Sequence, residues 1–470
     1  MKKLFSIFLA LTLVFLMIPA TIVSAADSIE NFKAVTGDTK VTLSWDAVSG
    51  AKSYTVLWKK SSSKSFTEIA TVKTVKVNVT KLKNGVSYDF AIRADNGAET
   101  PVLTVSPKSG AASTVYAVYT KAEDSVMESA ADAVKNMGAG WNLGNTLDSY
   151  GDWIGLGKPV KNYETAWGNP QANEKLIKSL ADTGFGAVRV PVTWRQHIDS
   201  SGKIDKAWLD RVQEVVDMIL DNGMYCIINV HHDTGTDGWI IASESGYKNA
   251  EKKFKKIWEQ VAERFKDYDE KLIFECMNET LNDADDWNAT DSASASAITK
   301  YQQAFVDIVR KSGGNNGERN LVVSPYAASS NMSIINSFKL PEDTVDGHLI
   351  MEVHNYDPQG FTWKNATWTT MRDTWGTAQD KKDMENFFSG LSKKAKALGV
   401  PAIVGEFSSD NKDNESERAE HAEYFVKTAT KYGIRAFWWD NGDLNGCKIF
   451  DRSNGKILFE KIVNALVDNA

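Results

Sequence analysis

The sequence predicts an α/β protein, a (β/α)8 TIM barrel preceded by a small all-β, immunoglobulin-like sandwich. Residues 26–107 hold short alternating apolar runs separated by turn signals, and residues 124–470 repeat an apolar run and a helical pattern eight times. The 42% apolar content is sufficient for hydrophobic cores in both parts. Strands that alternate with helices pair in parallel beneath a helical coat, and about 250 residues are typical of such a barrel.

An open, doubly wound sheet is the alternative architecture for the second part. Such a sheet wants a Gly-rich phosphate turn directly after a strand. Gly138-Ala139-Gly140 comes before the polar end of the first predicted strand and lacks the third glycine. The barrel is therefore the better prediction.

Residues 1–25 have the features of a secretory signal peptide. Two lysines precede an apolar run from Leu4 to about Pro19, and Val23-Ser24-Ala25 supplies the small residues of a cleavage site. The run is short for a spanning helix, which needs about 20 apolar residues. We therefore expect a secreted, extracellular protein without membrane contact once the signal is removed.

Charge and cysteine content narrow the class of partner. The formal net charge of −7 repels phosphate backbones and anionic lipid. Nucleic acid and membrane partners are therefore not expected, whereas a neutral substrate is expected. The three cysteines, Cys226, Cys276 and Cys447, allow at most one disulfide, and the first two lie in apolar runs as small buried hydrophobes. We expect a monomer.

Residues 26–107 form the predicted sandwich. Alternating runs at 40–45, 53–58, 75–79 and 88–93 are separated by Gly and Asn turns. The patterns Leu43-Ser44-Trp45, Ala51-x-x-Tyr54-x-Val56 and Tyr88-x-Phe90-x-Ile92 resemble a fibronectin type III domain. A passive spacer is the simpler role and a glycan-binding accessory module is the alternative. Residues 108–123 are predicted to be a linker.

Residues 124–470 form the predicted barrel, and each apolar run ends in polar residues. The helical patterns occupy residues 173–183, 206–222, 248–266, 296–312, 381–398, 416–432 and 455–468, with a weaker one at 329–338. Functional residues of such barrels gather at the carboxyl ends of the strands. These ends fall near Asn145, Pro191, His231, Glu279, Pro325, Tyr356, Glu406 and Asp440.

Two carboxylates at strand ends suggest the chemistry. Glu279 and Glu406 follow the fourth and seventh strands and should face each other across the barrel mouth. Cleavage of a glycosidic bond needs an acid for the leaving oxygen and a carboxylate on the opposite face of the sugar, and at about 5–5.5 Å the second carboxylate attacks directly with net retention. Glu279 is the candidate acid/base and Glu406 the candidate nucleophile.

Four further residues suit this chemistry. Arg189 can hold Glu406 ionised through its fixed fork of donors, and Tyr356 can donate to the same carboxylate. Asn278 can donate to the sugar 2-OH, an interaction that strengthens in the transition state. His354 can position the acid. The order of these residues along the barrel strands makes the set much more specific than any member alone.

The motifs of the second part resemble glycoside hydrolase family 5, in particular its bacterial endo-β-1,4-glucanase branch. They are Gly-Trp-Asn-Leu-Gly-Asn at 140–145, Glu-Thr-Ala-Trp-Gly-Asn-Pro at 164–170, Val-Arg-Val-Pro at 188–191, His231-His232, Asn278-Glu279, His354-Asn355-Tyr356, Gly405-Glu406-Phe407 and Trp-Trp-Asp-Asn at 438–441. Thr280 and Cys276 depart from the usual pattern. The resemblance implies retaining hydrolysis of internal bonds in cellulose and related β-glucans, without a cofactor. It implies that the cleaved bond is surrounded by Arg189, His231, His232, Asn278, His354, Tyr356 and Trp439.

Three alternatives differ from this prediction. The same mechanism can serve xyloglucan, mixed-linkage β-glucan or mannan as the main substrate. A metal-dependent hydrolase would use His231, His232, Asp233 and Glu279, but adjacent strand residues point to opposite faces, so we expect no metal. A non-catalytic glycan-binding protein would rely on the sandwich, and the intact pair of Glu279 and Glu406 argues against it.

The 15 tryptophans fit a sugar polymer. Trp45 and Trp58 belong to the sandwich, and Trp141, Trp208, Trp258 and Trp438 are expected in the barrel core. Sugar rings present apolar C–H faces to aromatic planes, so Trp side chains in a cleft suit a neutral polysaccharide. The candidates in loops at strand ends are Trp153, Trp167, Trp194, Trp239, Trp287, Trp363, Trp368, Trp375 and Trp439.

Overall fold

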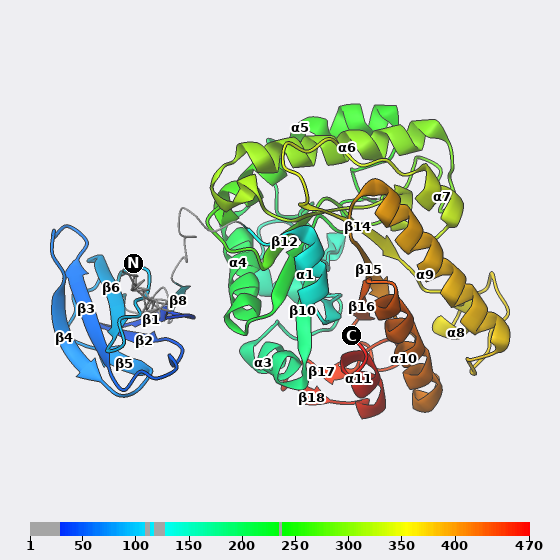
Figure 1. Ribbon diagram of the computed structural model, residues 1–470. Coiled ribbons are helices and arrows are strands. Elements are labelled where there is room, and N and C mark those ends of the chain that lie inside the picture. Colours follow the sequence, from blue (N-terminus) through cyan, green and yellow to red (C-terminus); the bar gives the residue numbers. More distant parts are fainter. Residues whose placement is uncertain (1–28, 109–112, 117–126, 235–236) are drawn as a thin grey trace, which may run out of the picture. The chain divides into compact units, whose positions relative to one another are not determined.

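The computed structural model describes residues 29–108, 113–116, 127–234 and 237–470 and divides the chain into two units, Met1–Val118 and Tyr119–Ala470 (Figure 1). The predicted signal peptide, residues 1–25, and most of the predicted linker lie outside the described residues. Among the described helices, none combines the length and the apolar character that crossing a bilayer requires.

The first unit is an antiparallel sandwich of two four-stranded sheets, ordered β5-β2-β1-β8 and β4-β3-β6-β7. Alternate residues such as Val41, Leu43 and Val56 point inward and are fully buried. The last strand pairs with β1 at residues 113–116, so the sandwich continues beyond residue 107, into the segment predicted as linker. The strands are β1 Lys33–Gly37, β2 Lys40–Ser44, β3 Tyr54–Lys60, β4 Thr67–Val72, β5 Lys76–Val79, β6 Tyr88–Ala94, β7 Leu103–Val105 and β8 Ser113–Tyr116.

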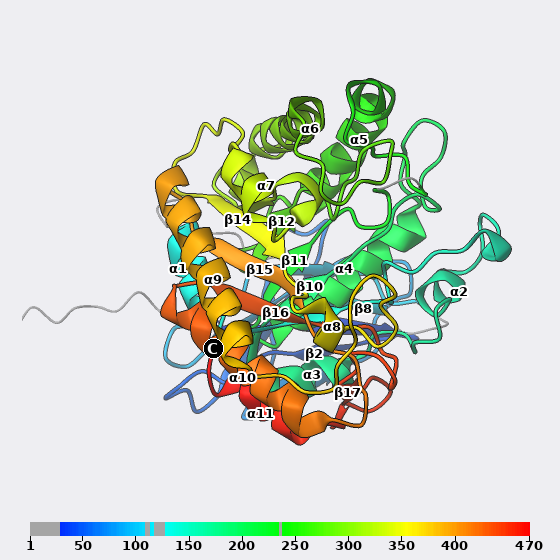
Figure 2. The ribbon, with the colours of Figure 1, turned by 90° about the vertical axis from the view of Figure 1, so that its right-hand side faces the viewer.

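The second unit is a closed barrel of eight parallel strands in the order β10-β11-β12-β13-β14-β15-β16-β9, which confirms the predicted TIM barrel. Figure 2 shows the strands inside a ring of helices. The strands are β9 Ala139–Leu143, β10 Phe185–Val190, β11 Tyr225–Ile228, β12 Leu272–Glu275, β13 Leu321–Val323, β14 Leu349–His354, β15 Ala402–Phe407 and β16 Arg435–Asp440.

Seven of the described helices begin at a side chain that accepts a hydrogen bond from the backbone of the first turn, and the helices that the sequence predicted lie within about five residues of their expected bounds. Asn173 accepts a hydrogen bond from Leu176 N at the start of α3, and Gly184, with φ of 109°, ends that helix. The helices are α1 Ala130–Asn136, α2 Val160–Glu164, α3 Glu174–Thr183, α4 Lys206–Asp221, α5 Glu244–Phe265, α6 Ser292–Lys311, α7 Met332–Ser337, α8 Gln359–Thr362, α9 Ala378–Leu398, α10 Glu415–Lys431 and α11 Glu460–Val467. The remaining elements are the 3-10 turns Asp152–Ile154, Gly314–Gly317 and Tyr326–Ala328 and the hairpin β17 Phe450–Asp451 with β18 Lys456–Ile457.

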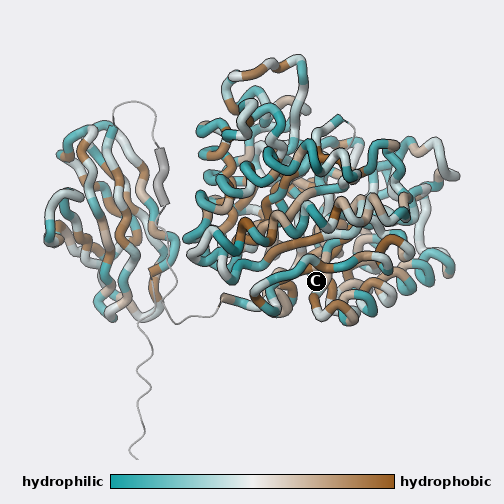
Figure 3. The backbone as a smooth tube through the Cα atoms, turned by 90° about the horizontal axis from the view of Figure 1, so that it is seen from above, coloured by the Kyte–Doolittle hydropathy of each residue, from teal (hydrophilic) through white to brown (hydrophobic). Residues whose placement is uncertain are grey.

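Apolar side chains fill the amino-terminal half of the barrel interior. Helix α1 contributes Ala130, Ala133, Val134 and Met137 to this cluster. Figure 3 shows the matching pattern, with brown runs along interior strands and teal prevailing at outer turns. The strand residues of the cluster are Ala187, Tyr225, Ile227, Ile273, Val322, Ile350, Ile403 and Phe437. This packing leaves the carboxyl ends of the strands as the polar end of the barrel.

Candidate active site

A polar layer lies directly above the apolar layer of the barrel. Side chains on a strand share a face every second residue, so the residue two places after each apolar one points inward as well. This position is held by Arg189, Glu275, Glu352 and Gly405 within their strands and by Asn142, which follows Gly140 on β9. Asn229 and Ser324 occupy the corresponding place directly after the last residues of β11 and β13. All of the polar side chains in this layer are buried.

Arg189 is the centre of the polar layer. Its Nε and Nη2 donate to Glu275 Oε2 and Oε1 at 2.6 and 2.7 Å, and its Nη1 donates to Glu406 Oε1 at 2.7 Å. Burial alone would lower the pKa of Arg189, but Glu275, Glu352 and Glu406 raise it well above its usual value. The guanidinium is therefore a permanent cation beneath the cleft.

Glu406, on β15, is held by both of its oxygens. Arg189 donates to Oε1, and the hydroxyl of Tyr356 donates to Oε2 at 2.7 Å. Burial raises the pKa of Glu406, and the positive charges of His354 and Arg189 oppose this rise. The predicted contacts of Arg189 and Tyr356 with this carboxylate are both present.

His354 links the two glutamates. Its Nδ1 lies 2.7 Å from Glu279 Oε1 and 3.6 Å from Glu406 Oε2. One ligand atom from each of these three residues lies within 4.8 Å of the other two. Burial would lower the pKa of His354, but the surrounding carboxylates, Glu406 first, raise it to about 10. The imidazole is therefore a cation between two carboxyl groups.

The side-chain amides of Asn278 and Asn229 are oriented by the N–H groups that donate to their oxygens. Arg189 Nη2 donates to Asn278 Oδ1 at 3.0 Å, so the Asn278 amide nitrogen keeps its N–H groups for the cleft. Val192 N donates to Asn229 Oδ1 at 3.0 Å, so Asn229 Nδ2 is the donor to His231 Nδ1 at 3.1 Å. Burial lowers the pKa of His231 well below its usual value. His231 is thus neutral and carries its only proton on Nε2.

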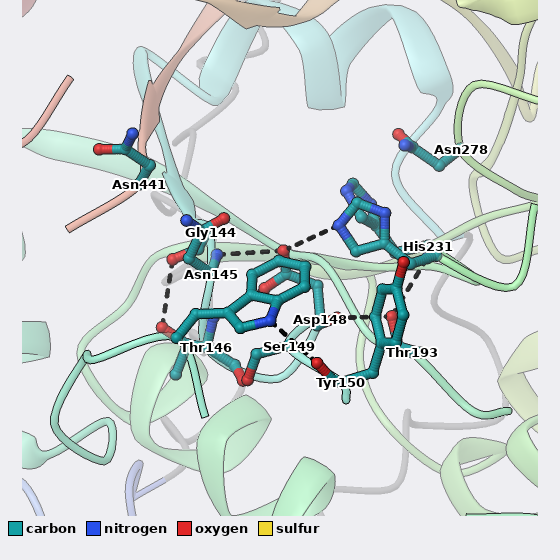
Figure 4. Close-up of polar contacts among 12 residues, drawn as sticks. Gly144, Asn145, Thr146, Asp148, Ser149, Tyr150, Thr193, His231, Asn278 and Asn441 are labelled. Carbon is teal, nitrogen blue, oxygen red and sulfur yellow. Dashed lines mark hydrogen bonds and ion pairs between the residues drawn. The ribbon is translucent and has the colours of Figure 1, made fainter. Parts of the chain in front are cut away.

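The loop after β9 supports His232. In Figure 4 the Asp148 carboxylate accepts from the backbone of Asn145 and Thr146, at 3.0 and 2.7 Å. The Thr193 hydroxyl donates to the Asp148 carbonyl at 2.7 Å, and His232 Nε2 lies 3.5 Å from the Asp148 carboxylate. His232 is therefore fixed by this loop rather than by a strand.

One argument made from the sequence about a metal site was wrong. The rings of His231 and His232 lie 4.5 Å apart, and Asp148, His231 and His232 offer ligand atoms within 4.8 Å of one another, because β11 ends at Ile228 and strand alternation does not apply beyond it. The donor set is nevertheless unsuitable, because His231 Nδ1 accepts from Asn229 and Nε2 carries the proton. Asp233 instead accepts from Trp194 N and Trp239 Nε1 at 2.7 and 2.8 Å.

The cleft above these residues has a volume of about 1080 Å³. Eight of the nine predicted site residues line it, and the ninth, Arg189, lies buried beneath. Aromatic rings lead outward from Tyr356 to Trp363 and then Trp368, with centroid distances of 5.4 and 6.3 Å. Trp439 lies parallel to the ring of His231 at 5.8 Å. Trp287 also lines the cleft.

Several of the predicted tryptophan platforms are not cleft residues. Trp194 is buried and donates its indole N–H to Asn229 O at 3.0 Å, and Trp375 is buried against Tyr424 of α10. Trp239 packs on the core, and Trp153 is 74% exposed but does not line the cleft. The position of a tryptophan in a loop after a strand therefore does not determine whether its indole faces the cleft.

Four buried residues of the polar layer were not predicted from the sequence. Glu275 and Glu352 lie in apolar runs, and a charge inside such a run was the signal that could have identified them. Asn142 accepts from Arg189 Nη1 at 3.0 Å, and Asn229 fixes His231. These residues orient the groups that line the cleft.

A (β/α)8 barrel with two adjoining carboxyl groups in an aromatic-lined cleft at its carboxyl end defines a glycoside hydrolase. Comparison with known families agrees. The family described as Cellulase (glycosyl hydrolase family 5) matches residues 147–445, and the fibronectin type III domain matches residues 27–106. The chain belongs to glycosyl hydrolase family 5 and carries a fibronectin type III domain before its barrel.

Known relatives are similar to the barrel unit. Endoglucanase A of Clostridium longisporum is 37% identical over 73% of this chain, which spans 66% of that relative's length. A family 5 enzyme of Prevotella bryantii, solved with a xyloglucan tetradecasaccharide, is 37% identical with a TM-score of 0.67 over 73% of this chain and 99% of that one. A lichenase of Caldicellulosiruptor sp. F32, solved with cellotetraose, is 33% identical with a TM-score of 0.69 over 75% of this chain and 100% of that one.

Proposed function

We propose that the chain is a secreted, retaining endo-β-1,4-glucanase that hydrolyses internal bonds of cellulose and related β-glucans. The observation that carries the proposal is the separation of Glu279 and Glu406, which bring carboxyl oxygens within 4.8 Å of each other. Retaining enzymes hold their two carboxyl groups about 5–5.5 Å apart, whereas inverting enzymes leave about 6.5–9.5 Å for a water molecule. Features of residues 1–25 support secretion.

The first step forms a covalent intermediate. Glu406 attacks the anomeric carbon while Glu279 gives its proton to the leaving glycosidic oxygen. Arg189 and Tyr356 hold the Glu406 oxygens in place at 2.7 Å each, so the nucleophile is oriented before the sugar arrives. The N–H groups of Asn278 face the cleft, where they can bind the 2-OH of the reacting sugar.

The second step releases the sugar. Glu279, now ionised, takes a proton from a water molecule, which attacks the anomeric carbon and frees Glu406. Two inversions give net retention of configuration. His354 contacts Glu279 at 2.7 Å in both steps and places the carboxyl group beside the scissile bond.

Xyloglucan and mixed-linkage β-glucan are the second candidate substrates. Small side chains of Ala327, Ala328, Ser329 and Ser330 line part of the cleft and leave room for branches on a glucan backbone. The relatives solved with xyloglucan and cellotetraose support the same substrate class. Rates of reducing-sugar release from carboxymethylcellulose, barley β-glucan, xyloglucan and glucomannan separate the candidates, and no activity on any of them would refute the proposal.

The mechanism is tested by trapping the intermediate. We expect 2,4-dinitrophenyl 2-deoxy-2-fluoro-β-cellobioside to inactivate the protein and to leave one fluorocellobiosyl group on the peptide that contains Glu406. Proton NMR of early products should show the β-anomer. A label on another residue, or an α-anomer as first product, would contradict retention at Glu406.

Two controls accompany the trapping experiment. Glu406→Gln should take no label, and Glu279→Gln should lose hydrolysis of polysaccharide while still binding it. The rate of hydrolysis in excess chelator is expected to equal the rate of the untreated protein. A lower rate in chelator would favour a metal-dependent mechanism.

Secretion is tested separately. The mature protein recovered from culture medium should begin at Ala26 or Asp27.

A further inference from the structure

Glu352 is a buried carboxylate that the proposed mechanism does not use. It lies on β14, two residues before His354, and is 1% exposed. Its Oε1 lies 3.4 Å from Arg189 Nε and 3.5 Å from His354 Nε2. Among the described residues, neither Glu352 oxygen has a partner in a hydrogen bond of ordinary geometry. The side chains that Glu352 faces at ion-pair distance are therefore Arg189 and His354.

Gly405 leaves the space that the Glu352 carboxylate occupies. A Cβ at position 405 would lie 1.6 Å from Glu352 Oε1. The φ of Gly405 is not positive, so the backbone conformation does not itself require glycine there. Position 405, directly before Glu406, therefore requires a small residue because the Glu352 carboxylate packs against it.

We propose that Glu352 is a positioning residue of the hydrolytic site, which keeps His354 protonated on both ring nitrogens so that Nδ1 donates to Glu279. This inference rests on the proposed role of Glu279 as acid/base. A neutral imidazole has one bare nitrogen. If Nδ1 were bare, it would accept the proton that Glu279 must deliver to the leaving group.

The groups around His354 support this role. Its Nδ1 faces Glu279 and Glu406, and its Nε2 faces Glu352. A carboxylate opposite Nε2 disfavours a bare nitrogen there because two lone pairs would meet. With a proton on each ring nitrogen, Nδ1–H occupies Glu279 Oε1 and leaves the other oxygen to hold the catalytic proton. The remaining charged neighbour, Arg189, is bound to Glu275 and Glu406.

The first experiment measures how rate depends on the leaving group. Glu352→Gln keeps the volume beside Gly405 and removes the charge. Values of kcat/KM are measured for aryl β-cellobiosides whose phenols span a range of acidity. General acid catalysis contributes about 10²–10⁴-fold. We expect a loss of about 10–100-fold for poor leaving groups and almost none for 2,4-dinitrophenol, which leaves without a proton. An equal loss on all substrates would overturn the proposal.

A matched variant controls for the loss of any buried carboxylate. Glu164 is fully buried and bonds Arg211 at 2.7 Å, outside the cleft lining. Glu164→Gln should lower the melting temperature but leave the dependence on leaving group unchanged. Glu352→Asp, which keeps the charge, should recover part of the rate on poor leaving groups.

The second experiment observes His354 directly. The chain has six histidines, and ¹⁵N-histidine NMR separates doubly protonated rings from neutral ones. We expect His354 to be doubly protonated at pH 8 in the native chain and neutral at pH 8 in Glu352→Gln, with His354→Asn assigning the signal. A doubly protonated His354 in Glu352→Gln would overturn the proposal.

The two proposals fail in different ways. If the native chain releases no sugar and takes no label at Glu406, the proposed function is wrong. If the native chain hydrolyses glucan with retention but Glu352→Gln keeps the native leaving-group dependence, only the role of Glu352 is wrong.

Discussion

Arg189 and Glu275 form a bidentate ion pair beneath the cleft, with Nε 2.6 Å from Oε2 and Nη2 2.7 Å from Oε1. Both side chains are at most 1% exposed. Removing one partner of such a pair leaves an uncompensated buried charge and costs about 3–5 kcal/mol. Because the same guanidinium binds Glu406, one side chain affects both the stability of the barrel and the position of the Glu406 carboxylate.

Arg189→Lys should therefore reduce stability and rate together. A lysine ammonium cannot supply the parallel pair of donors that Glu275 receives. Lysine keeps the positive charge and loses a donor to a charged partner, so we expect the free energy of unfolding, measured by urea titration, to fall by about 1.5–3 kcal/mol, with a large loss of kcat. Arg310→Lys is the control, because Arg310 makes a bidentate pair with Asp343 at 2.8 and 2.7 Å and does not line the cleft. That variant should lose stability and keep its kcat.

Tyr356→Phe should slow the reaction without unfolding the protein. The Tyr356 hydroxyl donates to Glu406 Oε2 at 2.7 Å, and burial raises the pKa of Tyr356 well above its usual value, so the donor stays protonated. A hydrogen bond to a charged group contributes about 1.5–3 kcal/mol, which corresponds to a loss of about 10–150-fold in kcat/KM. Tyr163→Phe, which loses a hydrogen bond to Gly155 O and one from Lys158 N away from the cleft lining, should keep the native kcat/KM. Equal rates for Tyr356→Phe and the native chain would refute this prediction.

Trp368→Ala should weaken binding of long substrates. Trp368 is 66% exposed, lines the cleft and donates its indole N–H to Gln359 at 2.6 Å. An aromatic contact of about 0.5–1.5 kcal/mol predicts a rise of about 2–12-fold in KM for polysaccharide. Trp153→Ala removes an indole that is even more exposed, at 74%, and does not line the cleft, so its KM should stay at the native value. Similar changes in both variants would mean that surface composition, rather than a subsite, controls KM.

His197 should make the protein less stable in acid. It stacks on Trp208 with a centroid distance of 3.6 Å, and burial lowers its pKa to about 3. The unfolded chain has a histidine pKa of about 6.5, so it binds one more proton than the folded chain between these two values. The stability contributed by neutral His197 is complete above about pH 6.5 and is lost as the pH falls toward 3.

His197→Phe tests this linkage. We expect the free energy of unfolding to depend less steeply on pH between 3.5 and 6, by up to about 1.4 kcal/mol per pH unit. Urea titrations by circular dichroism at several pH values measure this slope. His421, whose pKa burial also lowers to about 3, provides an independent second site, and His421→Phe should reduce the slope in the same way. An unchanged slope in His197→Phe would contradict the assignment.

The fold could be predicted because strands of this barrel end in polar residues. Apolar runs and helical patterns placed the eight strands and most helices within a few residues, and Asn278-Glu279 lies at the carboxyl end of the barrel as expected. The polar layer could not be predicted, because a strand pattern shows that Glu275 and Glu352 point inward but not that Arg189 fills the same layer. Strand alternation failed for His231 and His232, since the strand stops at Ile228.

The orientation of Asn229 and Asn278 determines how the cleft recognises a sugar. Both amide oxygens are occupied from below, so the groups offered to the substrate are the His231 Nε2–H and the Asn278 N–H groups. A hydroxyl that meets them is bound through its lone pairs, whichever way its own hydrogen points. These donors of His231 and Asn278 therefore detect whether an oxygen is present at a ring position of the sugar. An ether oxygen can accept their hydrogen bonds as well as a hydroxyl can. A deoxy position leaves the donors unpaired.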